Sequence, residues 1–257
     1  MHPALQPGNK SNTTTLVSAL YDINRHDRPF QEYKPWAEAT FQIALPMVLF
    51  TNAANLPWIR AARGDLPTFF ITEEDIPLEH LSDTVHAILS ELKNSNGAVE
   101  WRNKRYIPLQ FSKAVWLQRA IALNPFDSDI FFWVDAGLSR FFQNNQPHAP
   151  FPLLESSNLM QHKMYLTATE SFNELASKTP GEIIGSQRNY FMGTVFGGHI
   201  EAVKRVCVAL LNVLTLDMLQ QGLLDNEQIG LSVVFLRHKD WFEPLDATSL
   251  RCKVVCK

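Results

Sequence analysis

The sequence predicts an α/β fold in which a mixed, mostly parallel sheet carries helices on both faces. Short runs rich in β-branched and aromatic residues alternate with longer segments whose apolar residues recur at helical spacing. This alternation favours parallel strands, because each parallel pair needs a crossover connection that is usually a helix. In the first half of the chain the predicted strands are residues 13–23, 46–51, 68–72 and 129–134, and the predicted helices are residues 36–44, 56–63, 78–93 and 108–124.

The second half of the sequence has a less regular pattern. A proline-containing loop is predicted at residues 139–162. Beyond this loop we expect strands at residues 164–168, 182–185, 190–196 and 241–242, and helices at residues 171–177, 199–221 and 226–236. Neither an internal repeat nor a linker interrupts the chain. We therefore predict a single domain at residues 13–257, after a disordered lead-in at residues 1–12.

The composition is that of a globular protein with an aromatic-rich core, since the 257 residues include 17 Phe and 6 Trp. The net charge of −3, without a long basic run, argues against nucleic acid as a partner. No signal segment and no bilayer-spanning apolar run is recognisable, so we expect a cytoplasmic protein without a transmembrane segment. The basic segment 251–257 leaves peripheral contact with the inner face of the membrane open.

Residues 129–137, with the sequence DIFFWVDAG, carry the strongest functional signal. The apolar run before Asp135 predicts a strand that is buried on both faces. An ionised carboxylate at the end of such a strand is costly unless something pairs with it, and the two small residues that follow allow a ligand or metal to approach. We expect Asp135 to hold a divalent metal on a diphosphate. The alternative is an N-cap or a salt bridge within the loop.

Two strings of the sequence resemble the HtrL/YibB family. They are FFWVDAGLSRFF at residues 131–142 and TLVSALYDINR at residues 15–25. That family occurs in bacterial lipopolysaccharide and capsule loci and is related to nucleotide-sugar-dependent glycosyltransferases of the GT-A fold. The resemblance covers most of residues 14–245. It implies a single GT-A-like domain with a nucleotide-binding half, residues 13–137, and an acceptor half, residues 138–257.

The resemblance also implies an activity and a cofactor. The enzyme would move a sugar from a nucleoside-diphosphate sugar to a hydroxyl of a glycan or lipid-linked acceptor in surface polysaccharide biosynthesis. Asp135 would hold Mn²⁺ or Mg²⁺ on the diphosphate, and His238 would be an additional ligand. The usual GT-A motif is Asp-x-Asp, of which this sequence keeps one aspartate. For His238 the alternative is an ordinary surface histidine among charged neighbours.

Three residues are candidates for binding the nucleotide. Asp22 and Arg25 follow the first predicted strand, at the edge that meets the base and ribose in GT-A enzymes. Asp22 would accept from a ribose hydroxyl or a base N–H, and Arg25 would face phosphate; an ordinary turn is the alternative. Lys113 lies on the apolar arc of its predicted helix, where it either extends along apolar surface to water or reaches a phosphate.

Candidates for the sugar and the acceptor come from the second half. Arg188 would contact the sugar or a phosphate. Gly197 and Gly198 would form a turn that lines the sugar pocket before the long helix, or simply a tight packing turn. Glu227 would be the catalytic carboxylate, as general base or as stabiliser of an oxocarbenium-like centre. We expect Asp225 to cap its helix, and the helix dipole to favour ionised Glu227.

Two other functions remain open at this point. A sugar nucleotidyltransferase could share the predicted fold, but such enzymes usually have a glycine-rich loop after the first strand, and residues 18–29 contain no glycine. A catalytically silent binding or scaffold protein would explain the missing second aspartate.

Overall fold

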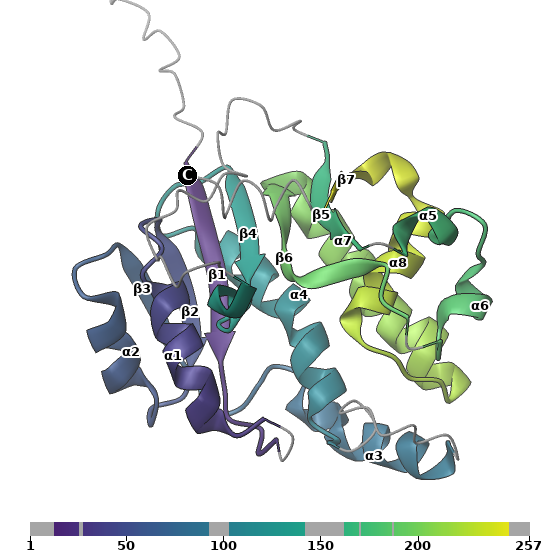
Figure 1. Cartoon of the computed structure of the whole chain (residues 1–257), viewed down its shortest axis with the longest axis horizontal. Coiled ribbons are helices and arrows are strands. Elements are labelled where there is room, and N and C mark those ends of the chain that lie inside the picture. Colours follow the sequence, from purple (N-terminus) through teal and green to yellow (C-terminus); the bar gives the residue numbers. More distant parts are fainter. Residues whose placement is uncertain are drawn as a thin grey trace, which may run out of the picture.

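A seven-stranded mixed sheet organises the part of the chain that the structure describes (Figure 1). The computed structural model describes residues 13–25, 28–92, 103–141, 162–169, 171–186 and 188–246. The strands are β1 (Thr14–Leu20), β2 (Met47–Thr51), β3 (Thr68–Thr72), β4 (Ile130–Val134), β5 (Met164–Ala168), β6 (Phe191–His199) and β7 (Phe242–Asp246). The predicted lead-in, most of the predicted loop and the basic C-terminal segment lie outside the described residues.

The strand order reverses next to β1. Across the sheet the order is β3-β2-β1-β4-β6-β5-β7, so the chain moves outward from β1 to β3 and then returns to the other side of β1. The strands from β3 to β4 pair in parallel, and β5 pairs in parallel with β7. Strand β6 runs antiparallel to both its neighbours. The predicted mixed, mostly parallel sheet is confirmed, and its reversal point is where ligands usually bind in such sheets.

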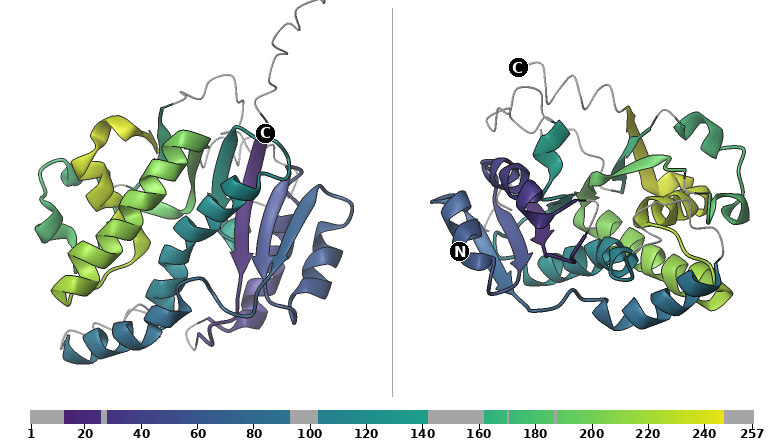
Figure 2. Two further views of the ribbon diagram at one scale, coloured as in Figure 1. Left: turned by 180° about the vertical axis from the view of Figure 1, so that it is seen from behind. Right: turned by 60° about the horizontal axis from the view of Figure 1, so that its bottom comes forward.

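Helices cover both faces of the sheet (Figure 2). The α-helices are α1 (Phe30–Phe41), α2 (Leu56–Arg63), α3 (Ser82–Glu91), α4 (Tyr106–Leu123), α5 (Phe172–Leu175), α6 (Pro180–Ile183), α7 (Ile200–Asn212) and α8 (Glu227–Arg237). Short 3₁₀ turns are η1 (Glu79–Leu81), η3 (Leu138–Phe141), η8 (Leu219–Gln221) and η9 (Lys239–Trp241), and η7 (Val213–Met218) is a π-helix. Helices α1 and α2 lie on one face, and α4 and α7 lie on the other.

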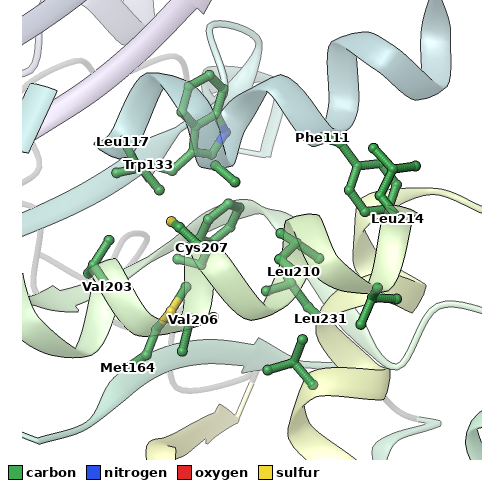
Figure 3. Packing of buried hydrophobic residues seen from close by; sticks show 14 of the residues in the cluster. Phe111, Leu117, Trp133, Met164, Val203, Val206, Cys207, Leu210, Leu214 and Leu231 are labelled. Atoms are coloured by element: carbon green, nitrogen blue, oxygen red, sulfur yellow. The ribbon is translucent and has the colours of Figure 1, made fainter. Parts of the chain in front are cut away.

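Successive residues of the central strands enter two separate hydrophobic clusters. Leu16 and Phe132 pack with α1 and α2, whereas Val17 and Trp133 pack with α4, α7 and α8. This is the two-residue period of a strand with both faces covered. Every residue of β4 is buried, as the apolar run predicts. On the second face Trp133 and residues of α4 lie over α7, where Cys207 is among the buried side chains (Figure 3).

The structure differs from the predicted elements at several places. The helix predicted at residues 36–44 is α1, which begins at Phe30 and ends at Phe41. Residues 180–183 form helix α6 where a strand is predicted at 182–185, because Thr179 and Glu182 form a capping box and Pro180 occupies the first helical turn. The predicted helix 199–221 is α7 followed by π and 3₁₀ turns, and ends where Gly222 adopts a φ of 64°. Most other predicted elements agree within a few residues.

Gly197 and Gly198 are not a turn before a helix. Both lie within strand β6, paired with Phe132 and Phe131 of β4 on one side and with β5 on the other. A Cβ added at Gly197 would lie 2.2 Å from the carbonyl oxygen of Phe131 and 2.5 Å from Cα of Phe132. Glycine therefore lets β4 and β6 approach closely here, and the predicted turn at these residues is wrong.

We expect Gly197→Ala to lower the free energy of unfolding by about 1–3 kcal/mol, because the new methyl group overlaps backbone that cannot move aside. Gly181→Ala is the matched control, since nothing lies within 4 Å of a Cβ added at Gly181. Chemical denaturation of the two variants and the wild type measures the difference. Equal stability of the two variants would contradict the packing role of Gly197.

Candidate active site

The candidate site lies at the reversal point of the sheet, where β1 and β4 end side by side. Asp135 directly follows β4, and its backbone N–H donates to the carbonyl of Thr194 on β6, at 2.9 Å. Residues 21–25 follow β1 at the same edge. Helix α4 brings Lys113 to this edge from one face, and the first turn of α8 brings Glu227. Segments far apart in sequence therefore meet here.

A buried ion cluster forms the floor of the site. The Lys113 ammonium lies 2.9 Å from Oδ1 of Asp135, 2.6 Å from Oε1 of Glu227 and 3.0 Å from the carbonyl oxygen of Gly193. The side chains of Lys113 and Glu227 are 5% and 1% exposed, and that of Asp135 is 22% exposed. An ammonium group has three N–H donors. The protein therefore supplies one acceptor for each of the three N–H donors of Lys113.

Trp133 fixes Asp135 from a second direction. The indole N–H of Trp133 donates to Oδ1 of Asp135 at 2.7 Å, so this oxygen accepts from both the indole and the lysine. The Lys113 ammonium also lies 5.6 Å from the centroid of the Trp133 ring, within the range of a cation–π interaction. The two contacts with Trp133 orient the carboxylate and the ammonium relative to each other.

Glu227 lies in the first turn of α8, where side chains are usually exposed, but its side chain is buried. Asn226 caps α8, because its side chain accepts from the N–H groups of Gln228 and Ile229. Asp225, the predicted cap, instead accepts from the N–H of Gly185 at 2.8 Å. Oε2 of Glu227 is buried and has no hydrogen-bond partner among the described residues. A buried carboxylate oxygen without a donor is a costly feature to maintain.

Gly193 makes room for Glu227. A Cβ added at Gly193 would lie 2.1 Å from Oε1 of Glu227. Any other residue at this position would push the carboxylate away from Lys113. The sequence indicated glycines near this point, but Gly193 rather than Gly197 or Gly198 is the one that contacts the site.

Burial and charge shift the protonation of the cluster. Burial raises the pKa of Glu227 to about 7, because desolvation outweighs the attraction of Lys113 and Asp135 adds repulsion. Burial alone would lower the pKa of Lys113, but Asp135 and Glu227 together raise it above its ordinary value. One cation between two carboxylates is best balanced when one carboxyl is neutral, and Glu227 is the more buried of the two. A pKa of about 7 leaves Glu227 only partly protonated near neutral pH, so burial opposes the ionised form that the helix dipole favours without abolishing it.

Two neighbouring cavities share this floor. The larger, of about 400 Å³, is lined by the ion cluster and by Arg25, Arg28 and Arg140, among others. The smaller, of about 90 Å³, is several times the volume that one water molecule requires. It is lined mainly by aromatic and apolar residues from the end of β1, from α4 and from β4, and by Asp22. Arg25, Arg28, Lys113 and Asp135 line both cavities.

An aromatic stack forms one wall of the smaller cavity. The rings of Tyr21 and Trp116 are stacked with centroids 5.5 Å apart, and those of Trp116 and Trp133 with centroids 5.7 Å apart. Stacked aromatic walls beside a carboxylate suit a flat, partly polar ring. Asp22 accepts from the backbone N–H of Asn24 at 2.8 Å, so it also forms the turn that the sequence offered as its alternative role.

The arginines of the larger cavity lie over aromatic rings. The guanidinium of Arg28 is 5.9 Å from the ring centroids of Tyr33 and Trp36, and that of Arg140 is 4.6 Å from the centroid of Phe141. Nη1 of Arg140 is buried without a hydrogen-bond partner within the described segments. Arg28 and Arg140 were missed by the sequence reasoning, although Arg140 lies in the same FFWVDAGLSRFF string as Asp135.

Of the sequence-predicted site residues, Asp22, Arg25, Lys113, Asp135 and Glu227 are brought together. Arg188, Gly197, Gly198 and His238 line neither cavity.

Arg188 and His238 have other contacts. The half-exposed Arg188 contacts Oε1 of Glu174 at 2.6 Å. His238 stacks on Trp241 with ring centroids 3.8 Å apart. It follows the last turn of α8, so a helix of about 16 Å separates it from Glu227. The structure therefore does not support a shared metal between Asp135 and His238.

The side chains around Asp135 do not fit a divalent metal. Oδ1 of Asp135 already accepts from Lys113 and Trp133, and the charged residues facing it across the larger cavity include three arginines. In the described ranges no three His, Cys, Asp or Glu residues form a group that could hold a metal ion. Metal sites for Mn²⁺ or Mg²⁺ normally collect several oxygen ligands. The predicted metal at Asp135 has no such ligand set here.

Comparisons with solved structures define the class of fold. The crystal structure of core-mannan synthase A from Aspergillus fumigatus, in its Mn/GDP form, matches with a TM-score of 0.52 and 12% identity, over 95% of this chain and 75% of that chain. The apo crystal structure of mouse xyloside xylosyltransferase 1 matches with a TM-score of 0.45 and 12% identity, over 92% of this chain and 85% of that chain. The fold is that of the GT-A-like glycosyltransferases.

The family follows from the sequence. A family model described as a bacterial protein of unknown function (HtrL_YibB) matches residues 12–246. The chain therefore belongs to the HtrL/YibB family, as the two strings indicate. A search of curated proteins found no significant match. Within the residues that the structure describes, no helix has the length and apolar character needed to cross a membrane.

We expect the pH dependence of stability to report the burial of Glu227. Its pKa in the folded chain is about 7, against an ordinary value of 4.5, so its contribution to the free energy of unfolding is complete below about pH 4.5 and is lost as the pH rises through 7. Relative to Glu227→Gln, the wild type should lose roughly 2–3 kcal/mol between pH 5 and pH 8. Thermal and chemical denaturation at both pH values measure this change.

Glu182→Gln is the matched control for this measurement. The pKa of the exposed Glu182 is lowered by hydrogen bonds from Thr179, so its contribution is present above its ordinary pKa and is lost only as the pH falls. The difference between the wild type and Glu182→Gln should stay constant from pH 5 to pH 8. A constant difference for Glu227→Gln as well would show that Glu227 is ionised throughout this range.

Proposed function

We propose that this protein is a glycosyltransferase that uses a nucleoside-diphosphate sugar as donor and a hydroxyl of a glycan or lipid-linked molecule as acceptor. The observation that carries the proposal is the buried cluster of Lys113, Asp135 and Glu227, in which Lys113 and Asp135 line both an aromatic and a cationic cavity and Glu227 lines the cationic one. The GT-A-like fold gives this cluster its context, because the cluster lies at the reversal point of the sheet. The role in surface polysaccharide biosynthesis belongs to the same proposal.

The smaller cavity suits the nucleoside. Tyr21, Trp116 and Trp133 stack on one another and line this cavity with aromatic atoms, against which a flat base can pack. Asp22 lines the same cavity and is placed to accept from a ribose hydroxyl or a base N–H. Arg25 lines both cavities, at the point where a nucleoside would join its phosphates.

The larger cavity suits the diphosphate and the sugar. Arg25, Arg28 and Arg140 line it together with Lys113, and guanidinium groups match the geometry of phosphate oxygens. The cavity is formed from both of the proposed halves. Arg25 and Arg28 come from the nucleotide-binding half, residues 13–137, whereas Arg140, Thr194 and Glu227 come from the acceptor half, residues 138–257.

Glu227 is the residue we assign to the chemistry. A carboxyl whose pKa lies near 7 can both take and give a proton at neutral pH. It would take the proton of the acceptor hydroxyl while that oxygen forms a bond to the anomeric carbon. The bond from the anomeric carbon to the diphosphate oxygen breaks, and the nucleoside diphosphate leaves with the electron pair. The cations of the larger cavity would stabilise the negative charge that develops on this leaving group.

The Mn/GDP form of core-mannan synthase A suggests a metal-assisted variant of this reaction. In this chain Asp135 is engaged with Lys113 and Trp133, so we assign no step to a metal. An enzyme of this kind would work in the cytoplasm or at the inner face of the membrane, where lipid-linked acceptors are presented.

A second candidate is a catalytically silent nucleotide-sugar-binding protein. It is favoured by the complete burial of Glu227 and by its contact with Lys113, which is the arrangement of a structural ion pair. Donor binding would then occur without turnover. One experiment distinguishes the two functions.

We expect calorimetry with a panel of UDP-, GDP- and dTDP-sugars to identify a donor that binds, and the wild type to hydrolyse or transfer its sugar. Glu227→Gln should keep the donor affinity but lose roughly 10²- to 10⁴-fold in rate, because the general base is removed while the cavity shape is retained. Product formation is followed by release of the nucleoside diphosphate.

Arg188→Ala serves as the control for this experiment, since Arg188 lies outside both cavities. Binding with equal, negligible turnover in the wild type and in Glu227→Gln would favour the silent binding protein. Absence of binding for every donor would reject both functions.

A further inference from the structure

We propose that Lys113 takes the place of the divalent metal in this site, so that its ammonium group and the surrounding arginines bind a diphosphate directly. This inference rests on the proposed function, because it concerns the same donor. It departs from the Asp-x-Asp arrangement that the GT-A resemblance implies.

Asp135, the carboxylate expected to hold a metal, already contacts a cation of the protein. The ammonium group of Lys113 lies 2.9 Å from its Oδ1 atom. That cation reaches the site from α4 and lines both cavities, so its ammonium group lies where the two cavities meet. A metal ion at Oδ1 of Asp135 would have to displace Lys113 into a buried environment with fewer anions, and one at the other carboxylate oxygen would find no group of three ligand side chains among the described residues. A charge without a partner in such an environment is strongly disfavoured.

The charged side chains that line the larger cavity also disfavour a metal. Among the described residues, the cations that line the larger cavity are Arg25, Arg28, Lys113 and Arg140, and the anions are Asp135 and Glu227. Both anions contact the same lysine. Counted over the described lining residues alone, four cations face two anions before any ligand enters, which is an excess of positive charge. An incoming dication would add to that excess, whereas a diphosphate would neutralise it.

Arg140 has a buried donor without an acceptor in the part of the chain that the structure describes. Its Nη1 atom is buried and donates to no acceptor among the described residues. A buried N–H group without an acceptor costs free energy, and a phosphate oxygen in the larger cavity would supply the missing acceptor. The Phe141 ring, 4.6 Å from the guanidinium carbon, restricts the position of this side chain. Arg140 is thus already placed for an anionic ligand.

Lys113 can accept a phosphate by exchanging one of its present partners. Its three N–H donors are used by Asp135, Glu227 and the neutral carbonyl of Gly193. The carbonyl is the weakest of the three acceptors, because it carries no net charge. A phosphate oxygen replacing it would leave the ammonium between three anionic groups.

The test is the affinity for UDP and GDP, measured by calorimetry in EDTA and in MnCl₂. We expect the nucleoside diphosphate that binds to do so in EDTA, with an affinity within about threefold of that in Mn²⁺. A loss of more than about tenfold in EDTA would overturn the inference while leaving the proposed function intact. Failure of both nucleotides to bind under either condition would overturn the proposed function, and this inference with it.

Single substitutions measure how much each cation contributes to the affinity for the nucleoside diphosphate. In EDTA, Arg140→Ala should weaken binding by roughly ten- to hundredfold, because a hydrogen bond to a charged group is removed. Arg188→Ala is the matched control and should bind like the wild type, since this arginine lies outside both cavities. Equal effects of the two arginine variants would contradict the direct contact.

Lys113 itself is tested in a charge-balanced variant. Lys113→Met alone would leave Glu227 buried without a cation, so it is combined with Glu227→Gln. This double variant should fold, as circular dichroism and thermal denaturation can verify, and should lose at least tenfold in affinity in EDTA relative to Glu227→Gln alone. Unchanged affinity in the folded double variant would overturn the role of Lys113. If the double variant does not fold, the result for Arg140→Ala and the comparison of EDTA with Mn²⁺ decide.

Discussion

The buried ammonium group of Lys113 is the contact on which the arrangement of the site depends. It joins α4 to the end of β4, to the first turn of α8 and to the carbonyl of Gly193 on β6. These segments come from both halves of the chain, with sequence separations of up to 114 residues. Removal of one partner of a buried ion pair lowers the free energy of unfolding by about 3–5 kcal/mol, because the remaining charge is left uncompensated. The cluster therefore fixes how the two halves meet at the site.

The topology of the sheet explains why this cluster forms where it does. β1 and β4 are parallel neighbours at the reversal point, so their carboxyl ends open at one edge. The antiparallel β6 brings its first residues, including Gly193 and Thr194, to that same edge. Trp133 then connects the core to the site, because its ring stacks on Trp116 while its N–H binds Asp135. The apolar core and the polar floor are thus parts of one arrangement.

The site contains two features that stability alone would not favour. Glu227 has a buried oxygen without a donor, and Arg140 has a buried N–H without an acceptor, within the described residues. Polar groups in this state are uncommon in folded proteins, and they concentrate where a ligand or a reaction requires them. Both residues line the larger cavity, which agrees with the proposal that this cavity binds a ligand.

Local sequence was enough to predict the α/β class, most of the strands and the position of Asp135 at the end of a buried strand, because these depend on apolar periodicity and on one carboxylate after a buried run. It also indicated Lys113 and Glu227, but not that they contact each other. Only the tertiary structure decided that Lys113 pairs with both carboxylates, that Gly193 rather than Gly197 faces the site, and that His238 is remote from it. The physical reason is that local spacing sets which side of a helix or strand a residue occupies, whereas charge pairing and close approach depend on segments that meet only when the sheet is assembled.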